Sequence, residues 1–548
     1  MNSSRVVTAA ILLLLAAAAG AQDFGETVQI DVIEVPVTVV DRDGHTVRGL
    51  TKANFELYDD GKRVPIDYFE AVDIARVTAG AERSESPLPP VSTRNFLLLF
   101  DLENSEPGAI GRAQQAAKQF LEGGLTPHDL VAVGIFTAER GAQLLTSFST
   151  DRNLIARAIG ALDDPQQFRI ADPLMLSALP LEQGARVMDV LQLRDEQTRN
   201  AASSRASDGE KRARLRVQLN QLGRVAHVLN RLHGQKQVIL LSEGFDARVV
   251  LGREELQSQE SRDEIDQVFR GEAYKVDSDQ RFGNVSARRD VDEMAELFRR
   301  SDVVLHAIDI AGLRSDVDAS EGYRRSSNES LSLLTAPTGG TVFKNVNDLA
   351  ENFSRMLRQQ EVVYVIGFNA RDTGKPGRFH TLKVKTVDAK VARVAHRSGY
   401  FETRPDLTEL EKTLTLAEII VGDIPIDDVE LRMTTSPMPG PNGKARIPVV
   451  IEIPGPDLLS EIKGSTATAT LFLYAFDKEN RVVDHLQQRI ALDLAQAGES
   501  IRTSGIRYYG TLRAQAGEYA IKAMVRVEES GRIGFTRTDV PVPAFDRA

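Results

Sequence analysis

An α/β domain with a doubly wound, Rossmann-like sheet, combined with β-sandwich domains in a multidomain α+β chain, is the fold that the sequence predicts. Three observations predict it. The chain has 548 residues, which is too many for one hydrophobic core. Short apolar runs alternate with segments of helical spacing across residues 92–360, an order typical of strands and helices around a parallel sheet. Patterns typical of β-strands stand before and after this region.

The apolar runs of the α/β region are short and continuous. Those at residues 96–100 and 238–241 are expected to be strands that are buried on both faces of a sheet. Apolar residues recur at helical spacing between 222 and 232. Two long polar and charged stretches break the alternation, and we interpret them as partly helical insertions on the rim of the sheet. These insertions cover residues 163–220 and 247–289.

The β-type segments on either side of the α/β region are expected to form one domain together. Residues 22–77 contain too few strands to bury a core alone, and the strands of residues 361–404 lack partners of their own. Pairing them gives a discontinuous β-sandwich that carries the α/β domain as an insertion. Residues 407–548 are β-rich, with turn residues between the strands, and predict a separate β-sandwich-like domain.

Residues 1–21 have the features of a secretory signal peptide. Arg5 supplies a positive charge, an apolar run follows over residues 6–19, and small residues stand at Ala19-Gly20-Ala21. The apolar run is shorter than the ~20 residues that a membrane-spanning helix needs. We therefore expect an exported protein, periplasmic or secreted to the extracellular side, with no membrane span after cleavage of the signal peptide.

Removal of this segment has a direct test. The mature protein is expected to begin near Gln22, so the intact mass of the exported protein should correspond to a chain without residues 1–21. A mature chain that still began with Met1 would contradict the export.

The composition excludes several classes of function. The chain has no cysteine, which excludes disulfides, thiolate metal sites and cysteine nucleophiles. Its formal net charge of -11 argues against nucleic acid or an anionic membrane as the main partner. The basic run at residues 211–216 is flanked by acidic residues and is interpreted as a solvated helix face. The sequence motifs of hydrolases, P-loop ATPases and zinc proteases are absent, so we predict no catalytic residue and no enzymatic activity.

Two carboxylates follow predicted strands at the edge where an open α/β sheet binds its ligands. Asp101 directly follows the first buried strand, and Glu243 follows the strand that ends at Leu241. Oxygen ligands of this kind suit Mg²⁺ or Ca²⁺. Acidic residues at strand ends also cap loops and helix N-termini. Spacing alone leaves both roles open and favours capping.

A family resemblance rests on the motifs around these carboxylates. They are the strand ending in Asp101-Leu102-Glu103-Asn104-Ser105, the helix after it, and the later Ser242-Glu243-Gly244. The chain also has an N-terminal segment at residues 49–61, and later segments at residues 338–368 and 397–400, that are similar to segments of one family and occur in the same order. In these features the chain resembles the von Willebrand factor A (vWA) domain, and in particular the bacterial exported vWA-related family, over residues 28–403.

The resemblance implies a metal-ion-dependent adhesion site (MIDAS). Its usual pattern is Asp-x-Ser-x-Ser on the first loop, a threonine from a second loop, and an aspartate after a later strand. This sequence keeps Asp101 and Ser105 but has Glu103 in place of the middle serine and Glu243 in place of the aspartate. These four residues are thus a degenerate, MIDAS-like metal site. The region expected to supply the threonine contains Asp172 and Ser177.

Three carboxylates that converge on one point need compensation for their like charges. Either Mg²⁺ or Ca²⁺ neutralises them, or at least one side chain turns away or pairs with a nearby arginine. We favour the second arrangement, because Glu103 and Glu243 both add bulk where the ion would lie.

These observations predict an exported, non-enzymatic binding protein whose vWA-like domain presents its upper rim to a protein or cell-surface ligand. The alternative is a structural or assembly module of the cell envelope, in which the vWA-like domain is a degenerate scaffold and the β-sandwich makes the contacts. A metal-dependent hydrolase is a third and less favoured class, because the catalytic motifs are missing. Metal-dependent binding of a partner would favour the first class, and metal-independent self-association the second.

Overall fold

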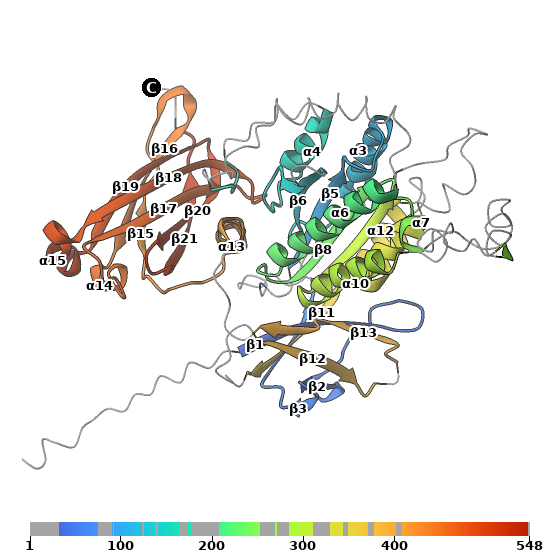
Figure 1. Ribbon diagram of the computed structural model, residues 1–548. Helices are drawn as coiled ribbons and strands as arrows, with labels where there is room; N and C mark the ends of the chain where they lie inside the picture. Colours follow the sequence, from blue (N-terminus) through green and yellow to red (C-terminus); the bar gives the residue numbers. More distant parts are fainter. Residues whose placement is uncertain are drawn as a thin grey trace, which may run out of the picture.

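The computed structural model has a mixed α/β architecture in which the described residues form five sheets (Figure 1). It describes residues 32–74, 90, 93–122, 125–137, 141–163, 172–176, 208–251, 269–270, 284–310, 329–343, 349–370, 378–388, 390–401 and 408–545. The predicted signal peptide lies outside these residues. Within them, no helix is both long enough and apolar enough to cross a membrane.

Two four-stranded antiparallel sheets form the first sandwich. One sheet has the order β13 (Arg393–His396), β1 (Val32–Val40), β11 (Val362–Asn369) and β4 (Tyr68–Asp73). The other has the order β14 (Gly399–Phe401), β12 (Phe379–Thr386), β2 (Phe55–Asp59) and β3 (Lys62–Val64). Val37, Leu57 and Tyr364 are fully buried in the core between the sheets.

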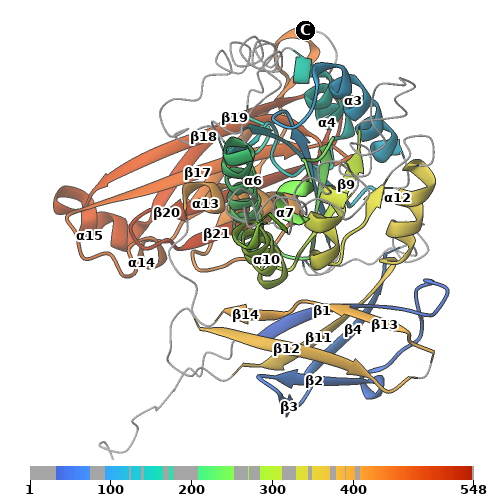
Figure 2. The ribbon, with the colours of Figure 1, turned by 45° about the vertical axis from the view of Figure 1, so that its right-hand side comes forward.

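This sandwich is discontinuous in sequence. β1 pairs antiparallel with β11, and β2 pairs antiparallel with β12. Each sheet therefore joins strands from residues 32–74 to strands from residues 362–401. The chain leaves the sandwich after β4 and returns at β11, so the α/β region lies between the two halves in sequence. In space the two halves form one unit, which lies below the α/β region in Figure 2.

A six-stranded sheet forms the centre of the α/β region. Its order is β10 (Val342–Phe343), β9 (Val303–Asp309), β8 (Gln235–Ser242), β5 (Arg94–Asp101), β6 (Leu130–Thr137) and β7 (Gly141–Leu144). All neighbouring strands are parallel except β6 and β7, which are antiparallel. Every residue of β5 and β6 is buried, which explains their unbroken apolar runs.

Helices cover both faces of this sheet, as an apolar sheet requires. One face is covered by α3 (Pro107–Glu122), α4 (Arg152–Gly160) and α12 (Leu349–Arg358). The other face is covered by α6 (Asp208–Leu229), α10 (Val285–Arg300) and α7 (Arg248–Leu251). Short 3-10 turns among the described residues are η1 (Lys52–Asn54), η3 (Ala161–Asp163), η5 (Ala336–Thr338) and η7 (Pro441–Gly443).

The predicted insertion at residues 163–220 extends too far. Residues 208–220 are the first part of α6, which packs on the sheet. Leu215, Leu219 and Leu222 bury one side of this helix, while the charged residues around Leu215 lie on its other sides. The predicted insertion at residues 247–289 likewise includes α7 and the start of α10. The rest of both insertions lies mainly outside the described residues.

The C-terminal region forms a second sandwich. One sheet has the order β15 (Arg432–Thr435), β16 (Ala445–Ile453) and β19 (Ile506–Ala514). The other has the order β18 (Val482–Asp493), β17 (Thr466–Phe476), β20 (Gly517–Val527) and β21 (Ile533–Val542). Alternate residues such as Ile447, Leu471 and Val525 face the core between the sheets. Two short helices flank the strands, α14 (Gly455–Leu458) and α15 (Leu494–Ser504).

This region does not begin with a strand, although the sequence predicts a β-rich block from residue 407. It begins with helix α13 (Glu409–Gly422). Thr408 and Glu411 form a capping box in which the Thr408 N–H and hydroxyl both donate to Glu411 Oε2, at 2.8 and 2.7 Å. α13 packs between α6 and the second sandwich, with Leu414 and Phe472 in one continuous core. The second sandwich is therefore joined to the α/β domain through α13.

Candidate functional site

The order of strands in the six-stranded sheet reverses at its centre. From β5 the chain builds outward through β6 and β7 on one side, and through β8, β9 and β10 on the other. Asp101 ends β5, and Glu243 directly follows β8. Both therefore lie at the carboxyl ends of neighbouring parallel strands, at the point where open α/β sheets bind ligands. We call the loops after these strands, residues 102–106 and 243–246, the upper rim.

Asp101 is fully buried beneath the upper rim. Its Oδ1 accepts the backbone N–H groups of Glu103 and Asn104, at 3.1 and 2.9 Å. Its Oδ2 accepts the Ser242 hydroxyl at 2.7 Å and the Gln218 amide at 3.1 Å. Burial raises the pKa of Asp101, and these hydrogen bonds oppose that shift. The carboxylate thus ties the loop after β5 to β8 and α6.

Glu243 is held by groups of opposite charge. It is only 4 % exposed. Its Oε2 accepts the Glu106 N–H at 2.6 Å, immediately before α3, where the helix dipole favours a negative charge. Its Oε1 lies 3.6 Å from Arg112 Nη2, and Arg112 Nε in turn donates to Ile310 O at 2.6 Å. Glu243 therefore caps α3 and pairs with an arginine of that helix.

The described residues do not fit a divalent cation in this arrangement. A carboxylate has about four acceptor directions, and five donor groups of the chain, the Asn104 side-chain amide among them, already bond to Asp101. The Ser105 hydroxyl accepts the Glu243 N–H at 3.4 Å, and the Ser242 hydroxyl accepts the Gly244 N–H at 2.9 Å. A cation would also meet the positive guanidinium of Arg112. In this structure Glu243 is the glutamate that pairs with an arginine.

The predicted site residues are only partly brought together. Asp101, Ser105 and Glu243 meet through Ser242 and the loop after β5. Asp172 is buried elsewhere and accepts the hydroxyl of Tyr474 on β17, at 3.4 Å. Ser177 lies outside the described residues.

Two residues that sequence reasoning missed complete the site. Gln218 is 2 % exposed and stands among the leucines on the buried side of α6. A polar residue at an apolar position of a helix is a signal of a buried hydrogen bond, so Gln218 was detectable from its spacing. Arg112 gives no such signal, because it is a half-exposed arginine on a surface helix.

Two other groups of side chains have the geometry of candidate metal ligands. In the described part of the chain, ligand atoms within 4.8 Å of one another occur in Asp41, Asp43 and His45, and in Asp59, Asp60 and His380. The first group is an exposed turn in which Asp41 Oδ1 accepts two backbone N–H groups. In the second, His380 lies 3.2 Å from Asp60, and Asp60 also pairs with Arg378. Ion pairs and turn geometry account for both.

Comparison with known proteins does not assign a family. No family model and no curated protein matches the chain. Among solved structures, a β-glucuronidase from glycoside hydrolase family 2 is 16% identical, with a TM-score of 0.15, and the match covers 20% of this chain and 11% of that one. BatB from Bacteroides thetaiotaomicron is 10% identical, with a TM-score of 0.25 and coverage of 49% and 98%. A mutant of the PilB minor pilin from Streptococcus sanguinis is 13% identical, with a TM-score of 0.24 and coverage of 51% and 64%.

Proposed function

We propose that this chain is an exported, non-enzymatic binding protein whose vWA-like α/β domain presents the upper rim to a protein or cell-surface ligand without using a metal ion. The observation that supports this most is the state of the two central carboxylates. Asp101 and Glu243 lie where the strand order reverses, yet each is already compensated by donors of the chain itself.

The two carboxylates are better suited to support the rim than to perform chemistry. A general base must have a lone pair within reach of a substrate proton, and the acceptor directions of Asp101 are occupied within a fully buried site. They instead fix the backbone of the loop after β5, which carries the half-buried Glu103 and the exposed Glu106 outward. A loop held rigid in this way loses little conformational entropy when it binds a partner.

The alternative function, an assembly module of the cell envelope, is supported by a different observation. α13 joins α6 and the second sandwich in one continuous core, which holds the second sandwich in a fixed place beside the α/β domain, as a scaffold requires. In that case the exposed strands of the second sandwich would make the contacts. Tyr509 on β19, which is 70% exposed, marks this surface.

Capture of partners from an envelope extract of the producing cell tests the proposal. The immobilised mature protein is expected to retain the same proteins in Mg²⁺ and in a chelator, and Glu103→Arg is expected to reduce their capture at least tenfold by reversing a charge on the rim. In parallel, millimolar Mg²⁺ or Ca²⁺ is expected to leave the melting temperature unchanged, since a cation that does not bind the folded state cannot stabilise it.

Tyr509→Ala serves as the matched control and should not change the capture. Loss of capture in Tyr509→Ala but not in Glu103→Arg would support the assembly module. A rise in melting temperature with Mg²⁺ or Ca²⁺ that disappears in Asp101→Ala would show that the rim binds a metal ion after all.

A further inference from the structure

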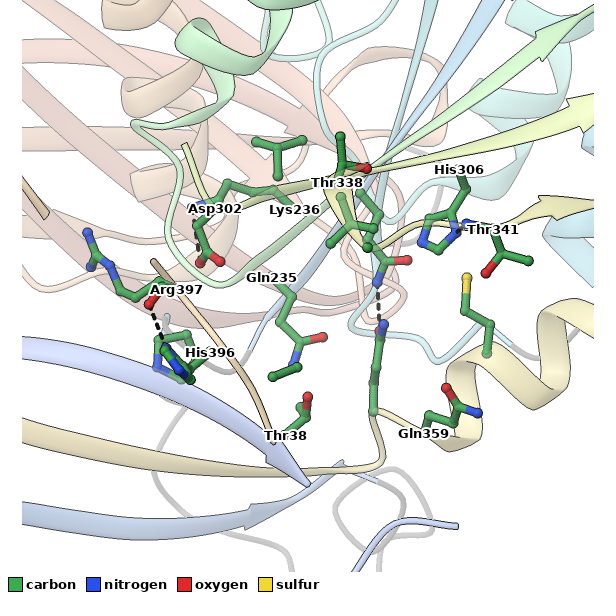
Figure 3. A pocket seen from close by; sticks show the side chains of 18 of the residues that line it. Thr38, Gln235, Lys236, Asp302, His306, Thr338, Thr341, Gln359, His396 and Arg397 are labelled. Carbon is green, nitrogen blue, oxygen red and sulfur yellow. Dashed lines mark hydrogen bonds and ion pairs between the residues drawn. The ribbon is translucent and has the colours of Figure 1, made fainter. Parts of the chain in front are cut away.

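A cavity lies at the opposite end of the six-stranded sheet from the upper rim, where the α/β domain meets the first sandwich (Figure 3). Its volume is about 790 Å³. The starts of β8 and β9 and the end of α12 form one wall, and β1 and β13 form the other. Small-molecule sites commonly have volumes of roughly 300–1,000 Å³ and commonly lie between domains.

The part of the cavity beside α12 is lined by neutral polar groups. Gln237 and His306 project from neighbouring strands on the same face of the sheet, because Gln237 pairs with Val304, two residues before His306. Thr341 and Gln359 lie close by, and Thr38 of β1 faces them from the sandwich (Figure 3).

One of these groups is buried without a complete set of hydrogen bonds. Gln237 is 2 % exposed and its Nε2 donates to Gln360 Oε1 at 2.6 Å, but its Oε1 has no partner among the described residues. A buried acceptor left unpaired costs about 1–3 kcal/mol. This oxygen can therefore accept a hydrogen bond from a water or from a ligand that enters the cavity.

His306 offers a complementary donor. Its Nδ1 accepts the Thr341 N–H at 3.2 Å, and burial lowers the pKa of His306 to about 4, so the ring is neutral and its Nε2 carries the proton. The ring is 5 % exposed and stacks on Phe343 at 6.0 Å between centroids. An acceptor and a donor thus line the same cavity.

The charged side chains that line the cavity already have partners within the chain, and among them Arg397 donates to Gly399 O at 2.8 Å. Lys236 Nζ lies 3.9 Å from Asp302 Oδ2, and the two side chains lie next to each other in Figure 3. Arg299 pairs with Glu296 at 2.7 Å, and Arg393 donates to the Gln359 amide oxygen at 3.2 Å. A charged ligand that bound beside Gln237 and His306 would lose its hydration there. These two side chains are neutral and would not supply an opposite charge in its place.

We propose that this cavity binds a small neutral polyhydroxylated molecule, of the size of a mono- or disaccharide, through Gln237 and His306. A hydroxyl group is at once a donor and an acceptor, so adjacent hydroxyls can donate to Gln237 Oε1 and accept from His306 Nε2–H. Because the cavity has walls from both domains, the bound molecule would also hold the first sandwich against the α/β domain.

Calorimetry and thermal melting of the mature full chain test this with glucose, N-acetylglucosamine, maltose and trehalose as probes. At least one sugar is expected to bind and, at about tenfold excess over its Kd, to raise the melting temperature by about 3 °C. Gln237→Leu should abolish this rise while leaving the sugar-free melting temperature nearly unchanged, because the loss of the hydrogen bond to the half-buried Gln360 offsets the removal of an unpaired buried acceptor.

Two further variants keep the result interpretable. Thr38→Phe fills the cavity from a half-buried position on β1 and should also abolish binding, whereas Gln488→Leu at an exposed position of β18 should leave it intact. Absence of any sugar binding, or equal binding by the wild type and both cavity variants, would overturn the proposal. Binding of phosphate or citrate that is lost in Lys236→Gln would overturn it in favour of ionic recognition. Glu103→Arg on the upper rim should leave sugar binding unchanged, which separates this site from the proposed partner surface.

Discussion

Replacement of Arg94 by leucine is expected to lower the free energy of unfolding by about 3–5 kcal/mol, because it removes the arginine that pairs with both oxygens of a buried aspartate. Arg94 at the start of β5 and Asp129 before β6 have side chains that are each 2% exposed. Arg94 Nε donates to Asp129 Oδ1 at 2.7 Å, and the second nitrogen of the guanidinium contacts Oδ2. Asp129 also accepts the Thr126 N–H at 2.6 Å, so the pair fixes the turn that leads into β6.

Chemical denaturation of the wild type and Arg94→Leu measures this loss as a shift of the unfolding midpoint. Arg507→Leu is the matched control. Arg507 pairs with Glu452 at 2.8 Å, but the side chains are 66% and 46% exposed, and such exposed pairs contribute only about 0–1 kcal/mol. Equal losses in the two variants would show that burial does not determine the strength of these pairs.

Replacement of Lys522 by alanine is expected to lower the free energy of unfolding by about 2–3 kcal/mol and to weaken the junction between α13 and the second sandwich. Lys522 is 2 % exposed on the central strand β20. Its Nζ donates to Ile420 O and Val421 O at the end of α13, at 2.9 and 3.3 Å, and lies 2.8 Å from Asp423 Oδ1. A cation at the C-terminus of a helix also interacts favourably with the helix dipole.

The loss is smaller than for Arg94 because the Asp423 carboxylate keeps a direct ion pair with Arg537 at 2.6 Å, whereas Arg152, the remaining cation beside Asp129, donates to the backbone oxygen of Asp129. Chemical denaturation followed by two spectroscopic probes, one in the α/β domain and one in the second sandwich, would measure this loss of stability. In Lys522→Ala the unfolding transitions of the two domains should occur at different denaturant concentrations, whereas in the wild type they should lie closer together. Lys478→Ala, whose pair with Glu518 is 66% and 69% exposed, should change neither the midpoint nor the coincidence of the probes. Coincident transitions in Lys522→Ala would show that the junction does not depend on this lysine.

The spacing of apolar residues along each segment made most strands and helices of the fold predictable. The run at residues 96–100 is apolar at every position because β5 has a neighbouring strand on each side and helices over both faces. α13 was missed, although its signal was present. Thr408 and Glu411 are spaced as a capping box, and the glycine and β-type patterns that follow residue 440 obscured a helix of 14 residues.

The chemistry of the candidate site was less accessible to sequence reasoning. Asp101 and Glu243 each stand at the end of an apolar strand, and such a strand can be recognised from its own short segment of sequence. Their partners Gln218 and Arg112 come from other helices, 117 and 131 residues away along the chain, and no local pattern specifies which helix will face a given loop. The cavity between the domains is likewise a product of packing between segments that are far apart in sequence.

The discontinuous sandwich also has a mechanical consequence. Val32 at the start of β1 lies opposite Asn369 at the end of β11, and the last strand of this sandwich, β14, ends at Phe401. Tension applied between Val32 and Phe401, the first and last strand residues of the sandwich, would load the hydrogen bonds of β1 with β11 and β13. The six-stranded sheet, enclosed between β4 and β11, would carry no pull until those pairs had separated.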